Sequence, residues 1–163
     1  MGVPLPNTKR ITSSIWEGES LQTIQEELAR VYAGRELNRL DLLRACAAAR
    51  RKSLKQAEIA RRLSISQPEV HRILRKIKSF PELLDKTPRE VILQFHAGRL
   101  EHEQMLQELK EWNYTYSRDA EPDNPEGQLT GGTWDDIPDA FHRDLITGED
   151  YEAIVEAVHP PAA

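Results

Sequence analysis

Apolar residues recur every three or four positions along most of the chain, and this is the spacing of amphipathic α-helices. The first such run follows Ser20, and Gly34 predicts its C-terminal end. Its apolar members are Leu21, Ile24, Leu28 and Val31. A second run covers 36–51, and strictly alternating patterns of useful length are absent. The pattern therefore predicts an all-α fold.

Two short helices joined by a tight turn are predicted within 54–78. Ser53 is expected to cap the first of them. Ser66 begins a capping box with Glu69, and Pro68 suits a first helical turn, because amides there have no helical partner. The apolar positions are Leu54, Ile59, Ala60 and Leu63 in the first helix and Val70, Ile73, Leu74 and Ile77 in the second.

The remainder of the chain carries two similar helical patterns. A shift of 46 residues aligns 87–109 with 133–155, which indicates an internal repeat. The matched pairs are Thr87 with Thr133, Val91 with Ile137, Phe95-His96 with Phe141-His142, Leu100 with Ile146, Met105 with Tyr151, and Leu109 with Val155. Thr87 predicts the cap of the first helix, and 96–100 predicts its end. Each copy is expected to form a helical hairpin that is too small to be stable alone.

These patterns predict five consecutive parts, and prolines and glycines mark the two irregular ones. The parts are an N-terminal arm at 1–18, a helical domain at 19–79 with its helix pair at 54–78, a helical hairpin at 80–112, a linker at 113–132 and an acidic C-terminal hairpin at 133–163.

Charge is distributed unevenly over these parts, although the net charge is only −5. Residues 44–78 carry 11 basic and 2 acidic side chains, a net +9. Residues 79–163 carry 6 basic and 19 acidic side chains, a net −13. A basic block of this density is typical of a surface that binds a polyanion, whereas the acidic remainder favours a different partner.

Six apolar positions in 56–75 follow the spacing of a known DNA-binding motif. They are Ile59, Ala60, Leu63, Ile65, Val70 and Ile73. In this spacing the segment resembles the helix-turn-helix family of bacterial DNA-binding proteins, with Ala60 as the small residue where the two helices approach most closely. Ser64 stands where glycine is commonest in that family, and this departure predicts a slightly different turn. The resemblance implies a helix-turn-helix DNA-binding bundle with the helical hairpins appended.

The resemblance also predicts which side chains contact double-stranded DNA. The second helix of such motifs enters the major groove with its N-terminal residues nearest the base edges, so Gln67, His71 and Arg72 are candidates for base readout. The phosphate candidates are Lys55, Ser66, Arg75, Lys76 and Lys78, with Arg50, Arg51 and Lys52 at the end of the preceding helix. Pro68 completes the predicted DNA-binding set.

The overall plan, a basic DNA-reading domain followed by an acidic segment behind a linker, resembles the antitoxin component of bacterial toxin–antitoxin systems. The resemblance implies an autoregulating transcriptional repressor whose C-terminal region neutralises a partner toxin. The predicted partner-binding residues are Trp134, Asp135, Asp136, Phe141, Tyr151 and Ile154. A homodimer is also expected, because helix-turn-helix proteins commonly read two half-sites, and the helix at 20–33 is the candidate for pairing.

Other interpretations stay open. The pattern also fits a phage or mobile-element type of repressor without a toxin, or a protein-interaction adaptor that does not bind DNA. A basic helix is often only a solvated face. The acidic segment could likewise be only a solvated face, or it could fold back over the basic helix.

Catalysis has little support in the sequence, since no phosphate-cradling glycine loop, nucleophile elbow or Ser/His/Asp arrangement can be picked out. The five histidines form no HExxH-type pair, and a single cysteine, Cys46, is too few for a cysteine-based zinc site. We therefore expect no enzyme activity, metal or cofactor. No run of about 18 apolar residues is present and the start lacks a secretory signal, so a cytoplasmic protein without a membrane partner is expected.

Overall fold

The computed structural model describes residues 20–117 and 132–162, and every regular element within them is helical. The predicted arm at 1–18 lies outside the described residues. The α-helices are α2 (Leu21–Arg51), α3 (Gln56–Leu63), α4 (Gln67–Ser79), α5 (Pro88–His96), α6 (His102–Glu111), α7 (Asp136–His142) and α8 (Gly148–Val158). Two 3₁₀ turns, η1 (Pro81–Leu84) and η2 (Thr133–Asp135), precede α5 and α7. The all-α prediction is confirmed for this part of the chain.

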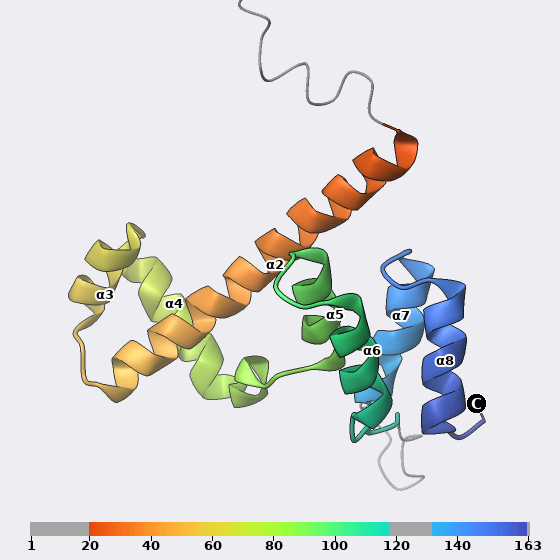
Figure 1. The fold of residues 1–163 in the computed structure, drawn as a ribbon. Helices are drawn as coiled ribbons and strands as arrows, with labels where there is room; N and C mark the ends of the chain where they lie inside the picture. The colour runs from red at the N-terminus through yellow and green to blue at the C-terminus, as the bar shows by residue number, and fades with distance from the viewer. Residues whose placement is uncertain (1–19, 118–131, 163) are drawn as a thin grey trace, which may run out of the picture.

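Helix α2 is one continuous helix of 31 residues, and the other helices pack along it or on one another (Figure 1). The predicted helix end at Gly34 is wrong, since Gly34 lies inside α2. Its neighbours Ala33 and Leu37 are buried against Leu93 of α5. This packing keeps the backbone helical across the glycine, whose cost in a helix interior is only about 1 kcal/mol.

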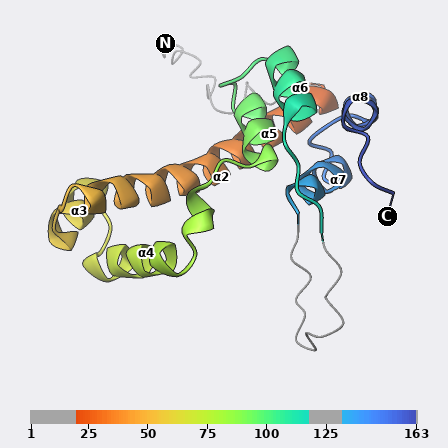
Figure 2. The ribbon, with the colours of Figure 1, turned by 90° about the horizontal axis from the view of Figure 1, so that it is seen from below.

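Helices α3 and α4 pack on the C-terminal part of α2 and form a lobe that we call the basic head (α2 from Leu42 onward, α3 and α4; Figure 2). Its buried core is small and consists of Cys46, Ile59, Ala60 and Val70. Half-buried apolar side chains surround this core: Leu42, Ala49, Leu54, Leu63, Ile65, Ile73, Leu74 and Ile77. All of the apolar positions predicted for the two short helices thus contribute to one core.

The turn between α3 and α4 depends on two serines. Ser64 adopts the left-handed conformation, with φ 55°, for which glycine is ordinarily favoured. Ser64 thus takes the backbone conformation that glycine ordinarily supplies at such a position. The Ser66 hydroxyl accepts a hydrogen bond of 3.2 Å from the Glu69 N–H, which confirms the predicted cap of α4.

Ser53 does not cap α3, in contrast to the prediction. It follows α2 with φ 61°, and its N–H donates to the Arg50 carbonyl at 2.9 Å. The Leu54 N–H donates to the Ala49 carbonyl at 3.1 Å. Both bonds satisfy carbonyls at the end of α2, so this segment is a C-terminal helix cap. Helix α3 begins only after Lys55, which makes no side-chain cap.

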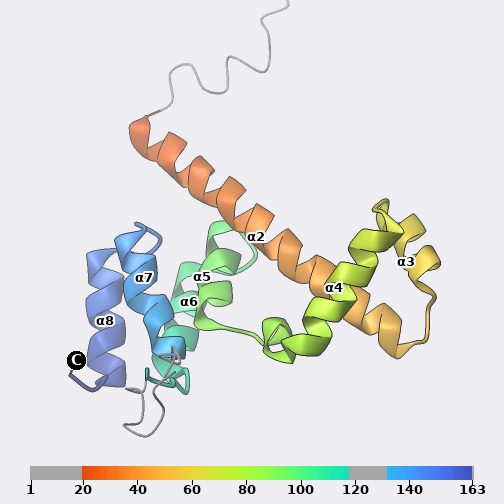
Figure 3. The ribbon, with the colours of Figure 1, turned by 180° about the vertical axis from the view of Figure 1, so that it is seen from behind.

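Helices α5 to α8 form a second lobe, the four-helix unit. It packs beside α2 on the N-terminal side of the head (Figure 3). Helix α5 packs on α7, and α6 packs on α8. One core serves both hairpins, and its buried members are Val91, Ile92, Met105, Leu109, Tyr114, Ile137, Ala140, Leu145, Ile146 and Ile154. The second hairpin therefore buries its apolar face on the first.

The internal repeat is confirmed in the geometry of the two hairpin turns. Helices α5 and α7 end at His96 and His142, which are 46 residues apart. Gly98 and Asp144 are also 46 apart, and both have positive φ angles, 76° and 58°. The three backbone hydrogen bonds that close the turn at Gly98 recur at Asp144 with the same shift. Asp144 thus takes the conformation of the glycine in the first copy.

Part of the predicted linker at 113–132 belongs to this unit, although 118–131 lies outside the described residues. Tyr114 is 8% exposed, and its hydroxyl donates to the Leu109 carbonyl. Trp134 meets Tyr114 edge-on, with 5.0 Å between the ring centroids. Residues 113–117 were predicted to be linker, but through Tyr114 they pack on the four-helix unit.

The same segment is tied to the start of the second hairpin by hydrogen bonds. The Thr115 N–H donates to the Thr133 hydroxyl, and the Thr133 N–H donates to the Thr115 hydroxyl, both at 2.9 Å. A Cβ on Gly132 would overlap the backbone of Thr115 and Tyr116. Glycine at this position is what allows the two segments to approach.

A bidentate ion pair joins α2 to α5. The Arg44 guanidinium donates to the two carboxylate oxygens of Glu90 at 2.6 and 2.8 Å, and also to the Leu84 carbonyl of η1 at 3.2 Å. Glu90 is 4% exposed, so its charge is almost entirely shielded from water. The hydrogen bond with Glu90 raises the pKa of Arg44.

We expect Gly34→Ala to stabilise the protein by about 0.5–1 kcal/mol, because alanine loses less backbone entropy in a helix. A Cβ at Gly34 would meet no heavy atom within 4 Å, so no clash offsets this gain. Gly98→Ala is the control, and the positive φ of Gly98 predicts a loss of about 1 kcal/mol. Urea unfolding measures both changes. A destabilised Gly34→Ala variant would contradict a continuous α2.

Breaking the Arg44–Glu90 pair from either side should destabilise the fold. We expect Arg44→Met to lower the free energy of unfolding by about 3 kcal/mol, because it strands a buried carboxylate. Glu90→Leu should cost less, about 2 kcal/mol, because Arg44 is 33% exposed and partly hydrated. The double variant should recover much of the loss. Urea unfolding of all four proteins gives the coupling energy, and simple additivity would show that the two side chains act independently.

Candidate nucleic-acid interface

Helix α4 is anchored by an apolar stripe, and this stripe decides which of its side chains reach solvent. Val70 is completely buried, and Ile73 and Ile77 pack against the same core. The Ser66 cap fixes where the helix begins and hence the direction of every later side chain. The exposed residues at its start and along its outer side are Ser66, Gln67, Pro68, His71, Arg72, Arg75, Lys76 and Lys78.

The N-terminal turns of α4 line an open groove together with α3. The groove has a volume of about 510 Å³, and its lining residues are Gln56, Gln67, Pro68, His71 and Arg72. The three side chains predicted to read bases therefore lie together. Amide and guanidinium groups are those that make bidentate hydrogen bonds with adenine and guanine edges.

A second cleft of about 510 Å³ lies between α4 and the end of α2. It shares Gln56 and His71 with the first groove, so the two form one continuous surface. Its basic lining residues are Arg50, Arg51, Arg75 and Lys78, and its apolar ones are Ala47, Leu74, Ile77 and Leu84. No acidic side chain lines either depression.

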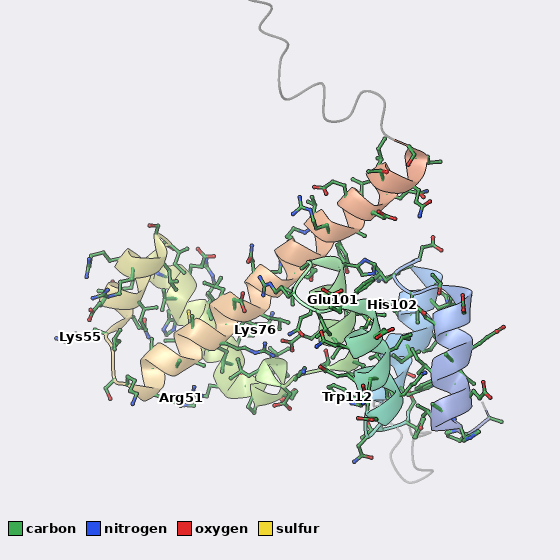
Figure 4. All side chains as sticks on the ribbon, viewed as in Figure 1. Arg51, Lys55, Lys76, Glu101, His102 and Trp112 are labelled. Carbon is green, nitrogen blue, oxygen red and sulfur yellow. The ribbon has the colours of Figure 1, made fainter. Side chains whose placement is uncertain are left out.

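Most of the positive charge of the head is not compensated by ion pairs. Arg62 lies 3.1 Å from Glu58, and Arg44 is paired with Glu90. Within the described residues, the other basic side chains of 44–78 form no ion pair: Arg50, Arg51, Lys52, Lys55, Arg61, Arg72, Arg75, Lys76 and Lys78. The labelled cations Arg51, Lys55 and Lys76 lie on the head, and the labelled Glu101, His102 and Trp112 lie on the four-helix unit (Figure 4).

The predicted phosphate candidates divide between two sides of α4. Arg75 and Lys78 line the cleft beside α2, together with His71. Lys76 lines neither depression and occupies another side of the helix. The Ser66 hydroxyl already accepts the capping hydrogen bond, so its first role is to begin α4.

Sequence reasoning missed Gln56, the one residue of α3 that lines both depressions. The cause was the helix start, which the predicted Ser53 cap placed too early. Gln56 is the first residue of α3, immediately after the segment that closes α2. Recognising the left-handed position at Ser53 as the end of α2 would have placed Gln56 at an exposed helix start.

The predicted partner-binding residues of the second hairpin do not form one surface. Ile154 is completely buried in the core of the four-helix unit, which corrects its assignment to a partner surface. Trp134 is half-buried beside Tyr114, and Asp135 accepts a hydrogen bond of 2.7 Å from the Ser117 hydroxyl. These side chains hold the unit together.

Phe141 and Tyr151 are the aromatic pair that remains near the surface. Their rings stack with 5.0 Å between centroids, and Phe141 is 39% exposed. Asp136, by contrast, accepts a hydrogen bond of 3.2 Å from the Arg89 N–H and so ties α7 to the first turn of α5. Burial raises the pKa of Asp136 despite this bond.

Other chemistry finds little basis in the part of the chain that the structure describes. No group of three or more His, Cys, Asp or Glu side chains there is arranged to hold a metal ion. Cys46 is completely buried, and desolvation raises the pKa of its thiol, which disfavours the reactive thiolate. None of the described helices has the length and apolar character needed to cross a membrane.

Comparison of the chain with protein-family models, with curated proteins and with solved structures gives no match. The functional proposal therefore rests on the residues and their geometry.

Proposed function

We propose that the protein is a sequence-specific DNA-binding regulator of transcription, in which α3 and α4 act as a helix-turn-helix unit. One observation carries the proposal: Gln67, His71 and Arg72 share an open groove at the N-terminal end of α4. In helix-turn-helix proteins this end of the second helix faces base edges in the major groove. The resemblance in apolar spacing and the geometry of the groove support the same assignment.

The electrostatics of the head support DNA as the ligand. Arg50, Arg51, Arg75 and Lys78 line a cleft beside the groove and form no ion pair in the described residues. Cations that neutralise phosphates release condensed counterions, and this release drives binding. The base candidates and phosphate candidates are thus adjacent, as direct readout with backbone positioning requires.

A second candidate function, toxin neutralisation, is favoured by the charge of the four-helix unit. Exposed acidic side chains on or at the starts of α6 and α8 form no ion pair among the described residues: Glu101, Glu103, Glu111, Glu149, Glu152 and Glu156. They lie on the lobe away from the basic head, so a basic protein could bind there while the head binds DNA. A regulator without a toxin would share the DNA surface but not this role.

The DNA-binding proposal is tested by fluorescence anisotropy with the DNA upstream of the gene and a shuffled fragment, over a salt series. We expect wild type to prefer the upstream DNA and to bind more weakly as salt rises. Arg72→Ala should reduce that preference by about 10-fold, as loss of a bidentate base contact worth about 1–3 kcal/mol would. Lys78→Ala should weaken binding to both fragments alike and lower the salt slope by about 1.

Lys110→Ala is the matched control, because Lys110 is an exposed lysine on α6, outside the head. It should change neither the preference for upstream DNA nor the salt slope. Equal and weak binding of wild type to both fragments would overturn sequence-specific recognition. The interaction-adaptor interpretation would then be preferred.

Toxin neutralisation is tested by co-expression with a small basic protein encoded by the adjacent gene, if expression of that protein arrests growth. We expect wild type to relieve the arrest. The triple variant Glu149→Lys, Glu152→Lys and Glu156→Lys should fail to relieve it while retaining DNA binding, because only the acidic surface is reversed. Equal relief by the variant would remove these residues from the role, and the absence of a toxic neighbour would favour a repressor without a toxin.

A further inference from the structure

One stripe of α2 is buried in its C-terminal part and open in its N-terminal part. Leu42, Cys46 and Ala49 of this stripe pack in the core of the head. Heptad steps from Ala49 and Leu42 lead back through the polar Arg35 to Leu28 and Leu21. Ile24 and Val31 follow Leu21 and Leu28 by three residues, and we call Leu21, Ile24, Leu28 and Val31 the α2 seam. Leu21, Leu28 and Val31 are 72%, 63% and 56% exposed. Helix α5 packs on α2 at Ala33 and Leu37, and Leu28 is the one seam residue that lines the cleft between α2 and the two hairpin turns.

We infer that the α2 seam pairs in antiparallel orientation with the α2 seam of a second copy of the chain. This inference does not depend on DNA binding. The described residues strongly expose five large apolar side chains, and three of them are in the seam. A repeat of three and four residues matches another helix with the same repeat, since each side chain then inserts between four side chains of the partner helix.

The surface of α2 next to the seam has the holes that such pairing needs. A shallow groove is lined by α2 residues alone: Arg30, Val31, Gly34, Arg35, Asn38, Arg39 and Leu42. These residues include two sets of four at helical spacing, Val31-Gly34-Arg35-Asn38 and Arg35-Asn38-Arg39-Leu42.

The head determines the orientation. From Leu42 onward it occupies the stripe that continues from the seam. In a parallel pair, the second copy would bring its own head to the same end and into the same space. In an antiparallel pair, the second helix runs past the N-terminal end of α2, so the described parts of the two heads lie at opposite ends of the pair.

Charge favours the same orientation and a specific register. A parallel pair would place Arg35 beside its own copy, and like charges repel. An antiparallel pair with Leu28 opposite Val31 places Arg35 beside Ile24 and Glu27 of the second copy. Leu21 then lies opposite Asn38, just before the head begins, and the overlap of 21–38 with itself is roughly 27 Å long.

The oligomeric state of the full chain is the primary test, by light scattering after gel filtration over a micromolar concentration range. We expect wild type to have twice the mass of one chain, and Leu28→Glu or Val31→Glu to have the mass of one chain with an unchanged circular dichroism spectrum. Phe80→Glu is the matched control, since Phe80 is also exposed, at 52%, but lies outside the seam. A monomeric wild type, or dimeric seam variants, would overturn the proposal.

Orientation is tested with spin labels at Arg30→Cys or Gln22→Cys in separate proteins, because the native Cys46 is buried. In the antiparallel pair, position 30 lies next to Ala29 of the second copy and gives a short distance. Position 22 of one chain lies opposite position 37 of the other. The two labels at position 22 should therefore be separated by roughly 20 Å along the helix axis, in contrast to the two labels at position 30. Equal short distances at both positions would indicate a parallel pair and overturn the assignment.

Discussion

The relation between the two lobes depends on the Arg44–Glu90 ion pair. A carboxylate as deeply buried as Glu90 is tolerable only when a cation compensates it, and Arg44 meets both of its oxygens. The same guanidinium also bonds the Leu84 carbonyl, so α2, η1 and α5 converge on one side chain. The local cap contributes as well, because the Thr87 hydroxyl accepts from the Glu90 N–H at 3.2 Å and holds the first turn of α5 in place. Glu90 stands where a capping-box acid would return to its own helix start, yet its carboxylate bonds α2 instead.

Helix α2 then works as a rigid spacer between opposite charges. The four-helix unit packs on it at Ala33 and Leu37, and the head packs on it at Cys46 and Ala49. About a dozen residues of helix correspond to roughly 18 Å, which exceeds the screening length of about 8 Å at physiological ionic strength. Apart from the Arg44–Glu90 pair, no acidic side chain of the four-helix unit forms an ion pair with a cation of the head in the described residues. A flexible connection would have allowed the acidic second hairpin to fold over α4, and the alternative of such an autoinhibitory contact has no counterpart in the described residues.

Features governed by neighbouring residues could be predicted from the sequence, and features governed by distant contacts could not. The caps at Ser66 and Thr87 are confirmed, because each needs only a hydroxyl and an amide three residues later. The end at Gly34 failed because Leu93, far along the chain, packs against the residues on both sides of the glycine. The prediction that Ile154 binds a partner was wrong, because an apolar residue on a short helix can face either a partner or the core, and only the fold decides which. The groove shared by Gln67, His71 and Arg72 was predictable from helical spacing alone, whereas the participation of Gln56 required the true start of α3.

The repeat explains why the second hairpin packs on the first and not on the head. Two copies of one apolar pattern present similar faces, and similar faces can bury each other in a near-twofold arrangement, with α5 on α7 and α6 on α8. Polar contacts between the copies are not symmetric. His96 Nε2 lies 2.6 Å from the Leu145 carbonyl, whereas the equivalent His142 bonds the Pro138 carbonyl of its own helix. His102 meets both carboxylate oxygens of Asp150 at 3.0 Å. The His102–Asp150 contact depends on side chains that differ between the copies, since Gly148 and Gln104 stand at the equivalent positions, so it favours pairing of the first hairpin with the second over pairing of identical hairpins from two chains. Among the described residues, three of the five exposed large apolar side chains lie on α2, and this is the surface that we propose for a second copy of the chain.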